Sequence, residues 1–535
     1  MIIRRIKRVI IHMKELAVRH RESQNFYKKN RRNWERGVLG ETPIYIAYTL
    51  YGIYEGLYGC LLFAKGMEET SKYKVIALTS KPDSLFRKIC KSFYVNYMLL
   101  YQVSLCHFSK LLCETLKMSK RISSGRDLLD YQYKGIKIGP STYDTILVKT
   151  GICTYEGEKS FKVLKIFFNS ILLVDRLTDI FAHNSHSVCI VMEEAYEAEI
   201  YRRVAKEYGG KIIWVNQMLK EYRDQNGQIT TYYDNALKRE IGEKLNETRE
   251  KYDYVCEVDK QLTGYYQNGN TEGIKGRVLS GDAVKNKITK TKKDIIDELG
   301  LDANRKNVIV FSHCMTDGPH ACYKLLYQDY FVWLKRTLEI ASNIKDVNWI
   351  VKFHPDRFRR FGEIRDTELI REKFEKVDNI YFFPDDYSLL SAQELADVII
   401  TARGKVGEEM SCYGIPIITA GSPCYSVWGY TYTFDEVSEY ERCLSEINKI
   451  DRLNSDKIDM AKCVFYAHSL ASNYIWDDYL GETLDNLAKA RKYGKSSRRV
   501  LDINFLREMS SDNMIEMMKK SHVYREGVCY ATESK

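Results

Sequence analysis

The strongest constraint on the fold is an alternation of short apolar segments with longer amphipathic segments, which occurs in two successive series along the chain. Runs rich in β-branched and aromatic residues, bounded by glycine or polar residues, predict buried strands. In the intervals, apolar residues recur at helical spacing, which predicts helices. Strands that alternate with helices in this way predict a mainly parallel sheet with helices on both faces.

The first series predicts strands over 44–48, 75–79, 144–148, 187–192 and 211–215. Between them it predicts helices over 56–67, 84–97 and 195–208. The composition then shifts to Lys, Glu, Asn and Gly over residues 221–293. This segment predicts one helix over 235–255 and an interdomain stretch over 267–281.

The second series predicts strands over 307–313, 349–353, 379–383, 397–401 and 415–419, and helices over 327–344 and 388–395. A chain of 535 residues exceeds what one hydrophobic core usually organises. We therefore expect two Rossmann-like domains, with a basic arm before them and a helical segment after them that packs back across the first domain. The expected boundaries are 1–40, 41–285, 286–480 and 481–535.

The basic arm combines an apolar stripe with a cationic face. Apolar residues recur at helical spacing at Ile2, Ile3, Ile6, Val9, Ile10, Met13, Leu16 and Ala17, among the cations Arg4, Arg5, Lys7, Arg8, Lys14, Arg19 and Arg21. Two interpretations fit this amphipathic helix equally: residues 1–24 lie on an anionic membrane surface, or they pack on the protein itself or on a second subunit. Because no nucleic-acid reader motif accompanies the charge, nucleic-acid binding is not expected.

The cysteines and the hydropathy both bear on localisation. The 14 cysteines contain no CxxC pair and follow no secretory leader, which is typical of reduced thiols. No apolar run approaches the roughly 18 residues that a membrane-spanning helix needs. We therefore expect a cytoplasmic protein, peripheral on the inner face of the cell membrane if its basic arm binds lipid.

The strongest local signal lies in residues 396–416, where a strand runs into a glycine turn and the turn opens a helix. Backbone N–H groups at the start of such a helix bind phosphate, and Gly404 and Gly407 would let a ligand approach the backbone closely. Arg403 and Lys405 add positive charge at the same place. Ordinary strand-to-helix connections also use such turns, so this motif alone does not establish a phosphate site.

A second signal lies at the end of strand 349–353, which delivers Lys352 and His354. Ligands of open parallel sheets bind outside the carboxyl ends of the strands, so His354 and the turn at 403–409 are expected to face one crevice. A histidine there can bind a phosphate, and its near-neutral pKa allows it to protonate a leaving group. The alternative is a histidine whose hydrogen bonds are simply satisfied at a strand end.

Two further strand ends point toward the same crevice. Ser312 and His313 end one strand, and Asp386 and Ser388 follow another. The second pair lies at a predicted helix start, near the expected place of a nucleoside ribose or base. Helix capping is the competing interpretation of these two residues.

The order of the motifs resembles that of bacterial capsule and surface-polysaccharide glycosyltransferases with the GT-B fold. Over residues 307–430 the chain carries, in order, Ser-His, Lys-Phe-His-Pro, Pro-Asp-Asp-Tyr-Ser-Leu, Ala-Asp-Val-Ile-Ile-Thr-Ala-Arg-Gly-Lys-Val-Gly-Glu-Glu and Tyr-Gly-Ile-Pro. The resemblance implies two Rossmann-like domains facing across a cleft, and transfer of a sugar from a nucleotide-activated donor to a surface-polysaccharide or glycolipid acceptor. Arg403 and Lys405 depart from the family pattern, which has a small residue or Thr after the first glycine.

The resemblance also implies roles for single residues of the C-terminal domain. In CMP-sugar transferases the histidine of a similar His-Pro pair contacts the nucleotide phosphate, and the corresponding residue here is His354. The acidic residue that closes the glycine motif reaches the donor ribose or sugar in related enzymes, and it falls on Glu409. The expected donor-binding set is Ser312, His313, Lys352, His354, Asp386, Ser388, Arg403, Gly404, Lys405, Gly407 and Glu409.

The N-terminal domain is expected to hold the acceptor. Gly52, Glu55 and Gly56 follow its first strand, where GT-B enzymes present an acceptor-side loop, and the stretch 135–144 also looks like one in the same enzymes. If the reaction inverts the anomeric centre, an acidic residue of this domain acts as general base. Glu55, Glu193 and Glu194 are candidates by their position at strand ends. The expected catalytic residues are His354, Glu409, Glu55 and Glu194.

No metal or other cofactor is predicted, and a nucleotide sugar is the expected co-substrate. No Asp-x-Asp motif occurs, and the closely spaced histidines His183 and His186 have no second ligand pair nearby. Two alternatives stay open. One is a GT-B relative that transfers a polyol phosphate from a CDP-activated donor or epimerises a nucleotide sugar. The other is a non-catalytic scaffold that binds a glycan or nucleotide in polysaccharide assembly.

Overall fold

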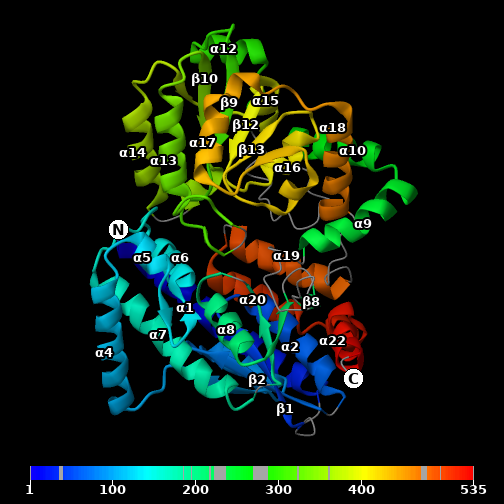
Figure 1. Ribbon diagram of the computed structural model, residues 1–535. Helices are drawn as coiled ribbons and strands as arrows, with labels where there is room; N and C mark the ends of the chain where they lie inside the picture. The colour runs from blue at the N-terminus through cyan, green and yellow to red at the C-terminus, as the bar shows by residue number, and fades with distance from the viewer. Residues whose placement is uncertain are drawn as a thin grey trace.

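The computed structural model shows two α/β domains, the N-terminal one below the C-terminal one in Figure 1. It describes residues 2–34, 40–70, 72–184, 186–193, 195–215, 219–221, 237–268, 287–321, 324–359, 362–470, 479–493 and 496–533. The interdomain stretch expected over 267–281 falls almost wholly outside these residues, as does Glu194.

The N-terminal domain is built on a six-stranded sheet in the order β3-β2-β1-β6-β7-β8. Neighbouring strands are parallel except β8, which is antiparallel to β7. The strands are β1 (Thr42–Tyr48), β2 (Tyr73–Thr79), β3 (Asn96–Leu99), β6 (Val188–Val191), β7 (Lys211–Val215) and β8 (Leu219–Glu221). The helices are α1 (Ile2–Arg31), α2 (Tyr54–Glu68), α3 (Ser84–Ser92), α4 (Leu105–Arg121), α5 (Gly125–Leu129), α6 (Gly139–Thr150), α7 (Phe161–Phe181) and α8 (Tyr196–Glu207), and a small hairpin pairs β4 (Gln132–Tyr133) with β5 (Ile136–Lys137).

The C-terminal domain repeats this plan with a parallel six-stranded sheet in the order β11-β10-β9-β12-β13-β14. Its strands are β9 (Lys306–Phe311), β10 (Val347–Lys352), β11 (Ile380–Phe382), β12 (Val398–Thr401), β13 (Ile417–Thr419) and β14 (Thr431–Thr433). Its helices are α12 (Lys292–Leu299), α13 (Tyr330–Ala341), α14 (Glu363–Phe374), α15 (Leu389–Leu395), α16 (Val406–Ser411), α17 (Val437–Ser445) and α18 (Ser455–Phe465), with short turns η2 (Pro355–Arg359), η3 (Cys424–Trp428) and η5 (Tyr466–Leu470). In order of appearance, both sheets have the Rossmann order 3-2-1-4-5-6.

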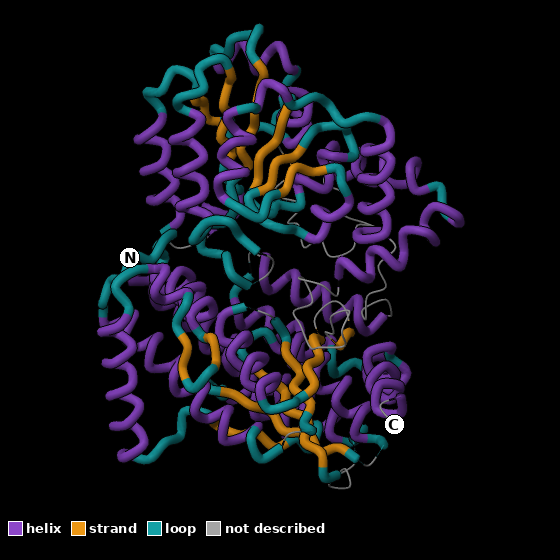
Figure 2. The backbone as a smooth tube through the Cα atoms, viewed as in Figure 1, coloured by secondary structure: helices purple, strands orange, loops and turns teal. Residues whose placement is uncertain are grey.

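Each sheet is covered by helices on both faces, as Figure 2 shows. In β1, Ile44, Ile46 and Tyr48 enter one apolar cluster with α2 and α3, while Tyr45 and Ala47 enter another with α6 and α7. Burial on both faces explains why the strands read as continuous apolar runs. Two Rossmann-like domains that face each other through their strand-end loops constitute the GT-B architecture, which confirms the expected fold class.

The strand predicted over 144–148 is wrong, because these residues lie in α6. Pro140 stands in the first turn of that helix, and Gly151 ends it with a left-handed φ of 76°. Tyr143, Ile146 and Leu147, at helical spacing, are all buried. The helix predicted over 84–97 also ends early, since β3 begins at Asn96.

The segments that flank the two sheets cross between the domains. Helices α9 (Leu237–Lys251) and α10 (Tyr254–Asn268) pack against α18 of the C-terminal domain. The last helices are α19 (Tyr479–Tyr493), α20 (Arg498–Glu508), α21 (Asp512–Met517) and α22 (His522–Glu533). They return to the N-terminal domain, where α22 packs along α2 and α20 along α1. The predicted return of this segment is therefore confirmed.

The expected basic arm, residues 1–40, contains α1, and its cationic stretch lies in the first part of that helix. The second half of this helix buries Phe26 and packs against α3 and α20, whereas Ile10, Ile11, Met13 and Leu16 are exposed. No helix in the described parts of the chain combines the length and the apolar content that spanning a bilayer requires.

Candidate functional site

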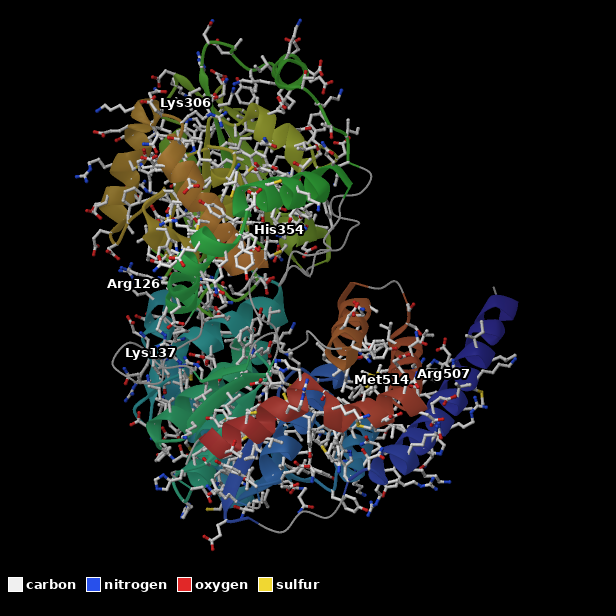
Figure 3. All side chains as sticks on the ribbon, turned by 90° about the vertical axis from the view of Figure 1, so that its right-hand side faces the viewer. Arg126, Lys137, Lys306, His354, Arg507 and Met514 are labelled. Carbon is white, nitrogen blue, oxygen red and sulfur yellow. The ribbon has the colours of Figure 1, made fainter. Side chains whose placement is uncertain are left out.

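The predicted donor residues gather at the carboxyl ends of the C-terminal strands. In Figure 3, Lys306 at the start of β9 lies in the upper part of the C-terminal domain. His354, just beyond the end of β10, lies in the part of the same domain that faces the N-terminal domain. The ends of β9, β10 and β12 are adjacent because β9 pairs with both other strands. This edge is where ligands of open parallel sheets bind.

The segment that follows β9 holds His354 in place. The Ser312 amide donates to the Lys352 carbonyl at 3.0 Å, and the Ser312 hydroxyl accepts from the His354 amide at 2.9 Å. His354 Nδ1 lies 3.1 Å from Cys314 Sγ and accepts from the Asp356 amide at 3.2 Å. The imidazole orientation at the strand end is therefore fixed through Nδ1.

The same segment also holds the turn that follows β12. His313 Nε2 accepts from the Arg403 amide at 3.0 Å, and the His313 ring stacks on Tyr330 with centroids 4.3 Å apart. Burial, together with the charges of Arg403 and His354, keeps the pKa of His313 well below its usual range. His313 is therefore neutral, and because Nε2 accepts, its proton lies on Nδ1. Residues 312–314 thus connect the two predicted motifs, which the structure brings together.

The glycine turn is closely packed by the protein itself. A Cβ at Gly407 would lie 2.3 Å from the Tyr425 hydroxyl, which donates to the Gly404 carbonyl at 2.6 Å. The Arg403 guanidinium donates to the Tyr330 hydroxyl and approaches the Gly318 carbonyl at 3.5 Å. Close packing therefore accounts for a glycine at position 407 even without a bound ligand. The Arg403 guanidinium contacts residues beyond β9 and so helps to hold the loop that follows this strand.

Three other predicted donor residues have structural contacts. Glu409 is 2% exposed and accepts from the Tyr266 hydroxyl at 2.5 Å. Ser388 caps α15 by accepting from the Ser391 amide at 3.1 Å, as the capping interpretation expected. Asp386 is exposed, and its carbonyl accepts from the Ile288 amide at 2.8 Å. In the contacts that the structure describes, Glu409 binds α10, and Asp386 and Ser388 bind the segment before α12. None of these contacts involves residues 312–314.

Two lysines complete the predicted donor set. Lys352 Nζ lies 4.7 Å over the Phe383 ring. Burial, reinforced by the nearby cation Lys287, lowers the pKa of Lys352 to about 8. Lys405 is exposed at the start of α16.

The N-terminal domain presents Glu193 to this edge. Glu193 follows β6, and its carboxylate accepts from the Thr49 hydroxyl, just after β1, at 3.3 Å. Burial, with the nearby carboxylates Glu197 and Asp317, raises the pKa of Glu193 to about 8. Asp317 belongs to the loop after β9 and accepts from the Tyr196 hydroxyl of α8 at 3.1 Å. Glu193 therefore lies where the two domains meet, beside the loop that carries His313.

Helix α6 provides further interdomain contacts, which sequence reasoning missed. Asp144 is 1% exposed and accepts from the His320 amide at 3.1 Å, and its other oxygen lies 2.6 Å from His320 Nδ1. Tyr143 donates to Asp329 at 2.5 Å. The available signal was the family-like stretch 135–144, but its polar end was assigned to a strand.

The expected acceptor-side residues lie elsewhere. Glu55 is 2% exposed and accepts from the Arg491 guanidinium of α19, with Oε1 2.8 Å from Nη2. A Cβ at Gly52 would overlap the Arg498 guanidinium, and one at Gly56 would lie 2.4 Å from Met192 Cε. The C-terminal helices thus cover Gly52 and Glu55, which the sequence left without partners.

Among the described residues, one set of side chains could hold a metal ion. The thiol of Cys314, the imidazole of His354 and the carboxylate of Asp356 place ligand atoms within 4.8 Å of one another. A metal on His354 Nδ1 would displace the hydrogen bond from the Asp356 amide. The set is therefore compatible with a metal only after a local rearrangement.

A surface hollow of about 520 Å³ lies at the opposite edge of the same sheet. It is lined by residues at or just before the starts of the strands, among them Lys306, Asp346 and Asp397. None of the predicted site residues lines it. Because ligands of such sheets bind at the carboxyl ends of the strands, we assign it no role.

Comparison with known proteins gives only distant similarity. No family model matches the chain, and no curated protein matches it. Among solved structures it is similar to KpsC, a β-Kdo 2,7 transferase of Thermosulfurimonas dismutans, with a TM-score of 0.32 and 13% identity over 59% of this chain and 89% of that one. It is also similar to the UDP-GlcNAc 2-epimerase of Neisseria meningitidis (TM-score 0.24, 9% identity, 80% and 97% covered) and to the spinosyn rhamnosyltransferase SpnG (0.27, 8%, 83% and 100%). Similarities this low do not identify a reaction.

Proposed function

We propose that this protein is a metal-independent glycosyltransferase that moves a sugar from a nucleotide-activated donor to a surface-polysaccharide or glycolipid acceptor. The observation that carries the proposal is the bridge formed by residues 312–314. It holds His354 on one side and the turn at Arg403 on the other, at the binding edge of a Rossmann-like sheet.

The donor phosphate is assigned to this edge because cationic and neutral donors meet there. His354 can donate a hydrogen bond to a phosphate oxygen, and Lys352 in its protonated form adds positive charge. His313 is held neutral, so it orients the turn and adds no charge of its own. Leaving-group charge would thus be stabilised by hydrogen bonds and side-chain cations, with no metal required.

The general base is assigned to Glu193. It is the described acidic residue that follows an N-terminal strand and lies beside the C-terminal loop at Asp317. A base must reach the acceptor hydroxyl, and its proton affinity should lie near the working pH. The raised pKa of Glu193 satisfies the second condition. The carboxylate of Glu55 fails the first condition, because the Arg491 guanidinium holds it.

The contact between Asp144 and His320 suits a closed arrangement of the domains. It joins α6 to the loop after β9, the same loop that carries His313. Closure of this kind excludes water from the reacting groups. Asp144 is therefore assigned a positioning role.

The nucleotide site is tested by thermal-shift measurement with CMP, CDP, UDP and GDP. We expect one of them to raise the melting temperature by about 2 °C or more at saturating concentration, because a ligand that binds only the folded state stabilises it. His354→Ala should weaken that binding about tenfold or more, since a hydrogen bond to a charged group is lost.

His183→Ala is the matched control, because His183 lies beyond the end of α7 and its Nδ1 faces the Asp179 carbonyl. No shift with any nucleotide, or equal shifts in both variants, would contradict the donor site.

Incubation with the corresponding nucleotide sugars, with and without EDTA, then tests transfer. Release of nucleotide with a glycan product in EDTA is expected. Interconversion of the sugar without transfer would identify an epimerase, and binding without turnover a scaffold.

Nucleotide affinity should fall as pH rises through about 8. Lys352 in the free protein loses its proton in this range, and only its charged form attracts phosphate. Between about pH 7 and pH 9 the charged fraction falls about tenfold, so the affinity should weaken by up to that factor. Calorimetry in buffers of different ionisation enthalpy should detect proton uptake on binding above pH 8.

Lys352→Met provides the control for this effect. The variant should bind more weakly at pH 7 and show little change toward pH 9. A wild-type affinity that stays constant across this range would remove Lys352 from the site. A variant that follows the wild-type profile would assign the titration to another group.

A further inference from the structure

An apolar patch lies on the outer surface of α4 and the start of α7. On α4, Leu105 is 88% exposed, and Phe108, Leu112 and Leu116 are 44%, 44% and 49% exposed. Their spacing of three, four and four residues places them on one face of the helix. Phe161, the first residue of α7, is 83% exposed. Figure 1 shows α4 at the outer edge of the lower domain with α7 beside it.

The patch is a fixed part of the fold, because α4 is firmly packed through another face. Leu111 and Met118 of α4 are fully buried. The Phe108 ring lies 5.2 Å from that of Phe168, and His107 Nε2 lies 2.7 Å from an oxygen of Asp175 on α7. The exposed apolar side chains therefore stand on a rigid two-helix surface, and they do not belong to a frayed helix.

Exposed cations accompany the apolar side chains on both helices. They are Lys110, Lys117, Lys120 and Arg121 on α4, and Lys159 and Lys165 at the start of α7. Of the nearby acidic residues, Glu114 pairs with Lys117 at 2.7 Å, and Glu156 and Glu158 lie in the loop before α7. The two helices therefore carry an excess of exposed positive charge beside the apolar row.

We propose that this patch docks the protein on an anionic lipid bilayer. Helices that lie in a membrane interface insert Leu and Phe between the headgroups and place Lys and Arg against lipid phosphates. The long lysine and arginine side chains can reach the headgroups while their stems cover apolar surface. The positive charge matches an anionic lipid surface. Patch residues are distinct from the donor and base residues, so this inference stands apart from the proposed function.

Vesicle co-sedimentation of the full chain tests the proposal. Vesicles of phosphatidylcholine alone are compared with vesicles that also contain phosphatidylglycerol. The wild type should bind the anionic vesicles, and added salt should weaken the binding, because phosphate contacts are screened. The Leu105→Ser/Phe161→Ser variant should bind about tenfold or more weakly, since two of the most exposed apolar groups no longer insert.

The matched control is Ile364→Ser/Leu369→Ser on α14, which removes two exposed apolar residues from the C-terminal domain. It should bind vesicles like the wild type. All variants should keep the nucleotide-induced thermal shift, or in its absence the wild-type melting temperature, which shows that they are folded. Lys110→Glu/Lys120→Glu should weaken binding to anionic vesicles without unfolding the protein.

Three outcomes would overturn the proposal. Equal binding to neutral and anionic vesicles would show that the positive charge of the patch does not select an anionic bilayer. An undiminished interaction in the α4–α7 variant, with loss in an Ile10→Ser/Ile11→Ser/Met13→Ser variant, would assign the contact to α1. Absence of vesicle binding, with self-association that Leu105→Ser/Phe161→Ser abolishes in sedimentation velocity, would make the patch an interface between copies of this chain.

Discussion

Replacing Glu193 with glutamine is expected to slow sugar transfer about 10²- to 10⁴-fold, the range typical of general acid–base catalysis. Glutamine keeps the size of the side chain and can still contact the Thr49 hydroxyl, but it cannot accept the acceptor's proton. The nucleotide-induced thermal shift should stay unchanged, because the nucleotide is assigned to the C-terminal domain. Initial rates with the donor identified by the screen provide the measurement.

Glu193→Gln is expected to slow transfer but to raise the free energy of unfolding near pH 8. Burial raises the pKa of Glu193 from 4.5 to about 8, so the folded state holds this proton more tightly than the unfolded state. The resulting stabilisation is complete below about pH 4.5 and is lost as pH rises to about 8. Glu193→Gln should therefore be the more stable protein near pH 8, as urea denaturation at several pH values would show.

Glu207→Gln is the control for both measurements, because Glu207 is an exposed carboxylate near the end of α8. It should leave the rate and the stability unchanged. If Glu193→Gln retained the wild-type rate, the base would have to be sought elsewhere. A loss of activity together with a loss of stability near pH 8 would instead indicate a structural role.

Periodicity predicted the inner strands of both sheets, because these strands are apolar on both faces. β1 and β10 are buried along nearly their whole length, so their sequences differ clearly from those of the polar connections. The failure at 144–148 has a local cause. Asp144 to Val148 read as a strand because Thr, Ile and Val favour one, yet Pro140 and Gly151 supply the start and end signals of a helix.

The site was predictable where its residues follow strands directly. His313, His354 and Arg403 could be placed at one edge because a parallel sheet brings the carboxyl ends of its strands together. Ser388 had two interpretations, a donor contact and a helix cap, and the structure shows the cap. The role of Glu409 rests on the family resemblance alone, and nothing in its local sequence indicates that Tyr266 of α10 holds its carboxylate.

Contacts between distant segments account for what the sequence could not show. The partner of Glu55 is Arg491, more than four hundred positions away, and the partner of Asp144 is His320 in the other domain. A carboxylate near a strand end looks the same in sequence whether it faces a substrate or a buried guanidinium. The distinction between Glu55 and Glu193 therefore required the tertiary structure.

The guanidinium of Arg491 is expected to be among the most important single side chains for stability. Its side chain is 7% exposed and contacts the carboxylates of Glu55 and Asp502, which are 2% and 5% exposed. Arg19 of α1 also donates to Asp502, at 2.7 Å. The cluster thus joins α1, α2, α19 and α20 through charges that have little access to water.

Arg491→Ala should lower the free energy of unfolding by about 3–5 kcal/mol, because removing one partner leaves buried charge uncompensated. Urea denaturation measures the loss. Arg336→Ala is the matched control: Arg336 makes the same two-bond contact, with Glu441 at 2.8 and 2.7 Å, but its side chain is 47% exposed. An exposed pair of this kind contributes about 1 kcal/mol or less. If the two variants lost equal stability, burial of the cluster would not be the cause.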